Sequence, residues 1–221
     1  ESLIRKRRSM PPQNWPDDLL SRLMNARDED SGQPMSESLL HDQSITTFFA
    51  GHETTARTMT FAWYALAANP LVTAQLHREL DAVLQGRSPT VEDLRRLPYT
   101  LQVIKEVLRL YPAAPFYVRD AITEDRFLGF SIPAGAAVML SPYYTHRHPW
   151  FWPDPDVFDP TRWTREKESE RNGYAYHPFA QGQRICIGNN FSLLESRLLL
   201  ALLAQRFTPR LRPGFAPQWT M

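Results

Sequence analysis

Apolar residues recur at helical spacing over much of this chain. Behind a potential capping serine, Ser36, they recur every three or four residues from Leu39 onward, which predicts one long helix over about 36–68. Asn69-Pro70 should end this helix, because the residue before a proline avoids the helical conformation. The same spacing predicts shorter helices, which cover residues 17–24, 70–84, 99–110 and 188–206, with a short one opened by a capping box at 90–93.

After Pro112 the pattern changes to short apolar runs separated by turn residues. We expect a β-hairpin between 127–132 and 137–140, with Pro133, Ala134 and Gly135 in its turn. The chain has 19 prolines, which divide it into short segments, mostly after residue 110. The predicted fold class is therefore mainly α with small β-sheets, an α+β fold.

Composition narrows the class of protein. The 221 residues are 43% hydrophobic and carry a net charge of +1, which suits a globular domain and gives no case for nucleic-acid binding. No run of about 18 apolar residues exists, so we expect no transmembrane span. The single cysteine excludes an internal disulfide and is compatible with a reducing cytosol. We therefore expect a soluble, cytoplasmic protein.

That cysteine, Cys186, lies in a glycine-containing stretch, 179–188, directly before an apolar helix. A helix N-terminus gathers free N–H groups and the positive end of the dipole, which favour thiolate over thiol. Gly182 and Gly188 allow positive φ and a close approach of the backbone to a large flat group. A lone cysteine is more often a buried, inert side chain, but the residues around this one argue against that.

The stretch has the form Phe-x-x-Gly-x-Arg-x-Cys-x-Gly and resembles the heme-binding loop of the cytochrome P-450 family. The resemblance implies that Cys186 is the axial thiolate ligand of the iron in heme b, iron protoporphyrin IX. It also implies that Arg184 faces a heme propionate and that Phe179 packs beside the thiolate.

A second motif lies inside the long helix, at 50–55. A glycine, an acid and two threonines are poor choices for a helix interior, and a solvent-facing polar surface is the simplest explanation. The surrounding apolar residues argue for burial instead; they are Phe48, Phe49, Met59 and Phe61. The motif resembles the oxygen-binding helix of the family.

That resemblance assigns roles within the helix. Gly51 would let it pass close over the heme, and Ala50 would face the substrate. Glu53 and Thr54 would form an acid–alcohol pair that delivers protons during oxygen activation. A role for His52 as a second iron ligand is disfavoured, because the distal position must stay open for oxygen.

Glu106 and Arg109 share a helix face at i and i+3. Followed by Leu-Tyr-Pro112, they resemble the Glu-x-x-Arg helix of the family, and Arg162 stands where the third member of a structural triad is expected. We expect both arginines to hold Glu106 bidentately. The triad would stabilise the proximal side and take no part in catalysis.

The segment 113–119 resembles the one that runs beside the heme. The resemblance implies that Arg119 is a second propionate partner and that four residues face the substrate, namely Ala113, Ala114, Phe116 and Tyr117. Ordinary core packing is an equal alternative for the two aromatic residues. His146 and His148 lack partners at metal-ligand spacing, so a structural role is favoured for them.

The resemblance covers essentially the whole chain. The residues of its motifs are most similar to those of bacterial fatty-acid-hydroxylating members. Members of the family are considerably longer. We therefore expect 1–221 to be a single partial domain, the C-terminal, heme-binding half of the fold, with the N-terminal half supplied by more chain or by a partner.

The activity implied is that of a heme-thiolate monooxygenase that inserts one atom of dioxygen into an apolar organic substrate. Electrons would come from NAD(P)H through a ferredoxin, a flavodoxin or a reductase. A peroxygenase driven by hydrogen peroxide and an incomplete, non-catalytic heme-binding remnant are the alternatives. The intact Glu53-Thr54 pair favours the dioxygen route.

Overall fold

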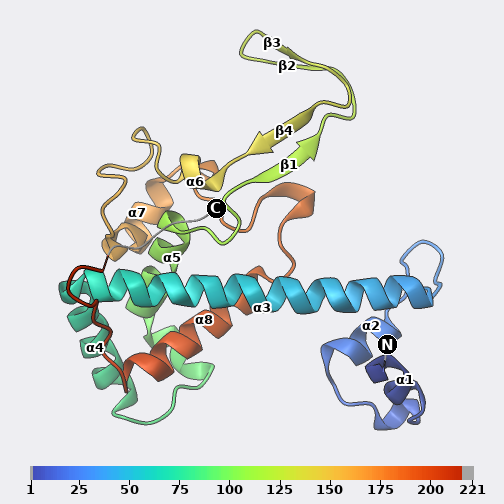
Figure 1. Ribbon diagram of the computed structural model, residues 1–221, viewed down its shortest axis with the longest axis horizontal. Helices are drawn as coiled ribbons and strands as arrows, with labels where there is room; N and C mark the ends of the chain where they lie inside the picture. The colour runs from blue at the N-terminus through green and yellow to red at the C-terminus, as the bar shows by residue number, and fades with distance from the viewer. Residues whose placement is uncertain (1, 216–221) are drawn as a thin grey trace. The chain divides into compact units, whose positions relative to one another are not determined.

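The computed structural model describes residues 2–215 and divides the chain into two units, Glu1–Glu53 and Thr54–Met221. The helix α3 (Glu37–Ala68) runs from the first unit into the second (Figure 1). The expectation of one partial domain over 1–221 stays a prediction.

The long helix α3 confirms the sequence prediction. Ser36 caps it, since its Oγ accepts a hydrogen bond from the Leu39 N–H at 3.2 Å. Within the helix, hydroxyls donate back to carbonyls of the preceding turn, as Thr58 Oγ1 does to the Thr54 oxygen at 2.9 Å. The helix stays continuous through the unfavourable Gly-His-Glu-Thr-Thr stretch.

In the first unit, short helical elements precede α3: α1 (Ser2–Arg8), η1 (Pro12–Asn14) and α2 (Leu19–Asn25). Asp18 caps α2 by accepting from the Ser21 N–H at 2.9 Å, and Arg7 donates to both of its carboxylate oxygens at 2.7 Å. The Arg7 guanidinium holds the pKa of Asp18 well below its usual range.

The core of the second unit is helical. It packs α4 (Pro70–Leu84), η2 (Glu92–Arg96), α5 (Pro98–Leu110) and α8 (Asn189–Ala204) with the C-terminal half of α3. Glu79 of α4 caps α5, because its carboxylate accepts the N–H groups of Tyr99 at 2.6 Å and Thr100 at 2.8 Å. The predicted helices at 70–84, 99–110 and 188–206 are confirmed to within about two residues.

Short elements fill the region between the strands and α8: α6 (Pro142–Thr145), η3 (Pro160–Trp163), α7 (Arg165–Glu170), η4 (Gly173–Ala175) and η5 (Gly182–Arg184). Within residues 2–215, no helix combines the length and the apolar character needed to cross a membrane.

The predicted hairpin is wrong. β1 (Tyr117–Asp120) pairs with β4 (Ala137–Leu140), and β2 (Asp125–Phe127) pairs with β3 (Phe130–Ile132), both antiparallel. The tight turn is at Leu128 and Gly129, whose φ angles of 51° and 86° suit a two-residue hairpin loop. The proline turn at 133–135 instead leads from β3 into β4, which continues alongside β1.

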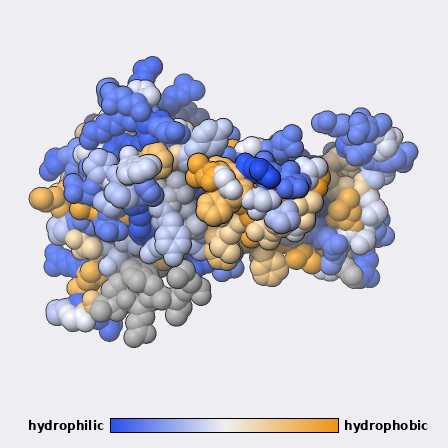
Figure 2. All heavy atoms as spheres, turned by 90° about the horizontal axis from the view of Figure 1, so that it is seen from above, coloured by the Kyte–Doolittle hydropathy of each residue, from blue (hydrophilic) through white to orange (hydrophobic). Residues whose placement is uncertain are grey.

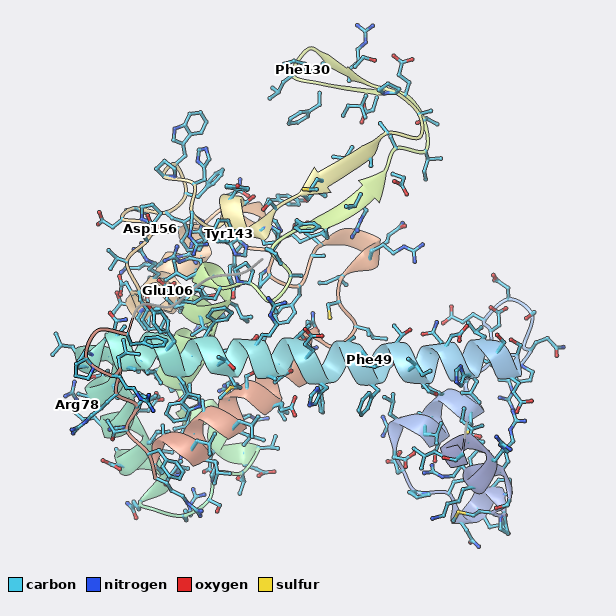
Figure 3. All side chains as sticks on the ribbon, in the orientation of Figure 1. Phe49, Arg78, Glu106, Phe130, Tyr143 and Asp156 are labelled. Carbon is cyan, nitrogen blue, oxygen red and sulfur yellow. The ribbon has the colours of Figure 1, made fainter. Side chains whose placement is uncertain are left out.

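Several large apolar side chains are exposed. Hydrophobic residues, orange in Figure 2, lie at the surface on the face shown there. Among the residues labelled in Figure 3 are Phe130 on the β2–β3 hairpin, which is 75% exposed, and Phe49 on α3, which is 64% exposed. Surfaces of this kind mark sites of contact with other groups or chains.

Candidate functional site

Cys186 lies in the turn that leads into α8. Its thiol is free and exposed. The Cys186 N–H donates to the Phe179 carbonyl at 2.9 Å, and the Cys186 carbonyl accepts from the N–H of Asn189, the first residue of α8, at 3.3 Å. The predicted position at a helix N-terminus is confirmed.

The backbone of the loop is tightly turned. Of the two glycines that allow positive φ, Gly182 uses this freedom with a φ of 75°, whereas Gly188 has a φ of −86°. Gly188 instead sits close to the thiol, where a Cβ would stand 3.8 Å from Cys186 Sγ. Ala180 takes a φ of 59°, a left-handed conformation that alanine seldom adopts and that the hydrogen bonds of the loop maintain.

The surroundings of the thiol fit a large, flat, mostly apolar group with acidic substituents. Ile185, Ile187 and Phe191 near it are 50%, 100% and 65% exposed, and nothing lies within 4 Å of a Cβ placed on Gly182. Arg184, in η5, is exposed and offers a cation on the same loop. An exposed thiol, open apolar surface and a guanidinium form a donor set suited to heme.

Arg119 lies on β1, half-buried, with its guanidinium 4.9 Å from the centre of the Tyr117 ring. Phe116 is 51% exposed, Ala114 is exposed and Ala113 is half-buried. Tyr117 is half-buried, and its hydroxyl lies 3.3 Å from His177 Nδ1. Tyr117 thus packs against Arg119 and His177, whereas Phe116 and Ala114 are exposed.

The motif in α3 does not meet the expected burial. Ala50, Gly51, Glu53 and Thr54 are exposed, and so are Phe48 and Phe49, by 68% and 64%. Burial begins farther along the same helix, with Thr55, Thr58 and Met59. Glu53 ends the first unit and Thr54 begins the second, as successive residues of one continuous helix.

The Glu106–Arg109 pair is fully buried in α5, where Figure 3 labels Glu106. Arg109 donates to both carboxylate oxygens of Glu106, each at 2.8 Å. Arg162 contacts the same carboxylate through a single ion pair of 3.4 Å, so the expected bidentate contact from this arginine is wrong. Its Nη2 donates instead to the Asp154 carbonyl at 2.8 Å, which turns the guanidinium away from a two-point contact.

Two further groups that the sequence did not predict hold Glu106. The indole N–H of Trp163 donates to its Oε2 and the N–H of Asp159 to its Oε1, both at 2.9 Å. Both lie in the Phe-Asp-Pro-Thr-Arg-Trp stretch, where only Arg162 carried a recognisable signal. The carboxylate is thus held by groups from two segments of the second unit, α5 and the 158–163 stretch.

His146 is also a buried structural residue. Its side chain is 0% exposed and its carbonyl accepts from Arg109 Nη1 at 2.9 Å. Burial lowers the pKa of His146 to about 3, and it also lowers the pKa of His177. In residues 2–215, no group of three or more histidine, cysteine or acidic side chains is arranged to hold a metal ion.

The free energy of unfolding should fall as the pH drops from about 6.5 toward 3, at about 1.4 kcal/mol per pH unit for His146 alone. Stability falls with pH because, in this window, His146 of the unfolded chain binds a proton and His146 of the folded chain does not. In the folded chain the ring is buried and faces Arg109, Tyr176 and His177. Urea unfolding at several pH values measures the slope. His146→Gln should reduce that slope, and an unchanged slope would contradict the assignment.

The chain belongs to the cytochrome P450 family, whose model matches residues 1–219. It is 43% identical to the cyclooctatin synthase of Streptomyces melanosporofaciens over 197 residues, which is 89% of this chain and 43% of that protein. It is 39% identical to the cyclooctat-9-en-7-ol 5-monooxygenase of the same organism, over 97% of this chain and 46% of that protein.

Solved structures agree with this assignment. The cytochrome P450 CYP102L1 matches with a TM-score of 0.90 and 31% identity, over 97% of this chain and 49% of that one. The retinoic acid bound cyanobacterial CYP120A1 matches with a TM-score of 0.91 and 35% identity, over the same shares. The α+β fold class is confirmed, and the chain spans less than half the length of the curated relatives named above.

Proposed function

We propose that this chain is the heme-binding part of a heme-thiolate monooxygenase that inserts one atom of dioxygen into an apolar organic substrate. The observation that carries the proposal is the free, exposed thiol of Cys186 in the turn before α8 of a chain that belongs to the cytochrome P450 family. Cys186 would be the axial ligand, while Arg184 and Arg119 would pair with the propionates. Phe179, half-buried beside the cysteine loop, and Gly51 of α3 would complete the heme contacts.

Bound heme b would supply a redox-active iron whose thiolate ligand favours O–O bond cleavage. The chain's own residues would prepare the site for this reaction. Cys186 lies in the turn directly before α8, and the exposed apolar side chains of Ile185 and Phe191 would exclude water from a bound group.

Glu53 and Thr54 would move protons to the reacting oxygen. They are successive residues of α3, both exposed, so both side chains are accessible to water and to a ligand. The carboxylate would take protons from solvent and the hydroxyl would hand them on, a relay that the dioxygen route needs and that a peroxide-driven reaction does not. Ala50, Ala113, Ala114, Phe116 and Tyr117 would face the substrate, and the Tyr117 hydroxyl lies 3.3 Å from His177 Nδ1.

The substrate class is inferred from chemistry and from relatives. The exposed, mostly aliphatic and aromatic residues suit an apolar molecule. The name of the related cyclooctat-9-en-7-ol 5-monooxygenase favours a cyclic alcohol as the substrate. The residues of the motifs, by their resemblance to fatty-acid-hydroxylating members, favour a fatty acid. Electrons would come from NAD(P)H through a ferredoxin, a flavodoxin or a reductase.

Thr54→Ala should lower product formation with dioxygen and an electron donor by about a hundredfold, because the proton relay is broken. Turnover driven by hydrogen peroxide alone should change little. Product formation, measured with each oxidant, and consumption of the electron donor, measured with dioxygen, separate a broken proton relay from a general loss of activity.

Thr60→Ala is the matched control, since Thr60 is an exposed threonine of the same helix that bonds back to the Ala56 carbonyl at 2.9 Å. Equal losses with both oxidants would contradict the relay. Turnover with peroxide but none with dioxygen in the unmodified protein would favour a peroxygenase. Heme binding without turnover by either route would leave a non-catalytic heme protein.

A further inference from the structure

His146 lies at a junction within the second unit. It follows α6, and its backbone carbonyl accepts a hydrogen bond from Arg109 Nη1 of α5 at 2.9 Å. Its ring accepts a second one, since the N–H of His177 donates to His146 Nε2 at 2.9 Å. Both bonds are buried. One residue therefore joins the Glu106–Arg109 pair to the segment that enters the cysteine loop.

Backbone hydrogen bonds continue from His177 to the thiol-bearing residue. The His177 carbonyl accepts from the Ala180 N–H at 3.1 Å, and the Phe179 carbonyl accepts from the Cys186 N–H at 2.9 Å. Ala180 between them has a φ of 59°, a conformation that persists only when its neighbours are held. The position of Cys186 thus depends on where the 177–179 backbone is fixed.

Few groups could replace His146 at this position. Its ring centre lies 5.1 Å from the ring centres of both Tyr176 and His177, and 6.5 Å from that of Trp152. The side chain is fully buried, so water cannot take over the acceptor role. Nε2 can accept the hydrogen bond from the His177 N–H only when the His146 ring is neutral, and burial keeps the ring neutral at ordinary pH.

We propose that His146 is a positioning residue for the cysteine loop, which its ring links through the His177 N–H to the buried Glu106–Arg109 pair. The effect on axial ligation rests on the proposed function of Cys186, whereas the effect on the backbone of the loop does not.

The test compares His146→Leu with His146→Gln, which keeps an acceptor oxygen, in the full chain. His148→Leu is the matched control, since His148 is exposed and lies two residues away. Amide hydrogen exchange at His177 and Cys186 is the first measurement. The second is the fraction of bound heme that shows the red-shifted thiolate Soret band after reduction and addition of carbon monoxide.

His146→Leu should speed exchange at His177 and Cys186 by about tenfold or more, with the amides of α4 unchanged, and should lower the thiolate fraction. His146→Gln should restore most of both, and His148→Leu should match the unmodified protein. Unchanged exchange at His177 and Cys186, or a uniform rise throughout the chain, would overturn the proposal.

If His146→Leu does not fold, the exchange rates of His146→Gln test whether His146 positions the cysteine loop. Retained protection at both amides supports the proposal, and a loss spread over the whole chain overturns it. An unmodified protein without a thiolate band would refute the proposed function, while the exchange measurements would still test the role of His146 in the loop.

Discussion

Cys186→Ala should abolish the red-shifted thiolate Soret band of the reduced, carbon monoxide-treated protein. The reason is that Cys186 is the only cysteine in the chain, so no other thiolate can replace it as a ligand. Monooxygenase turnover should fall to the background of free heme. An absorption spectrum of the reduced protein, recorded with and without carbon monoxide, measures the first effect, and product analysis measures the second.

The same substitution should leave the heme-free protein nearly as stable as before. Cys186 is exposed, so its removal should change the free energy of unfolding by no more than about 0.5 kcal/mol. Gln183→Ala, an exposed change in the same loop, is the control and should keep the thiolate band. A thiolate band in Cys186→Ala would show that the ligand assignment is wrong.

Glu106→Ala should lower the free energy of unfolding by about 3–5 kcal/mol, a large part of the stability of an ordinary domain. The substitution leaves the Arg109 guanidinium buried without its carboxylate. It also removes the acceptor of the Trp163 and Asp159 N–H groups. Urea unfolding followed by circular dichroism measures the loss.

Glu168→Ala is a matched control, because Glu168 pairs with Lys105 but its side chain is 35% exposed, whereas that of Glu106 is fully buried. Its effect should be within about 1 kcal/mol. Glu106→Gln should fall between the two alanine variants, since it keeps the shape and one acceptor oxygen but loses the charge. Equal effects of Glu106→Ala and Glu168→Ala would refute the central role of the buried carboxylate.

Local sequence determined the helices well. A capping serine and a terminal Asn-Pro pair mark both ends of α3, and both signals act within one or two turns of the helix. The position of the loop around Cys186 could also be predicted, because a turn followed by an apolar run places the cysteine before α8 independently of tertiary contacts. The Glu106–Arg109 pair follows from i and i+3 spacing in one helix.

Other features depend on groups far apart in the chain. The expected pairing of 127–132 with 137–140 was wrong because strand β1, which precedes both segments, provides a longer partner for β4 than β3 does. The single contact of Arg162 with Glu106 depends on where the Asp154 carbonyl stands, and no spacing within the sequence encodes that position. The exposure of the Ala50–Thr54 stretch was likewise missed, because flanking phenylalanines reveal a preference for burial and not whether a neighbour is present.

The sequence by itself determined the family, the helices and the location of the one thiol, because these depend on residue types and on spacing along the chain. Only the tertiary structure revealed that Trp163 and Asp159 share the Glu106 carboxylate and that His146 joins α5 to the cysteine loop. The physical reason is that a hydrogen bond depends on distance and direction in space. Groups separated by 31 to 57 positions, as His146 is from His177 and Glu106 from Trp163, meet only after the chain has packed.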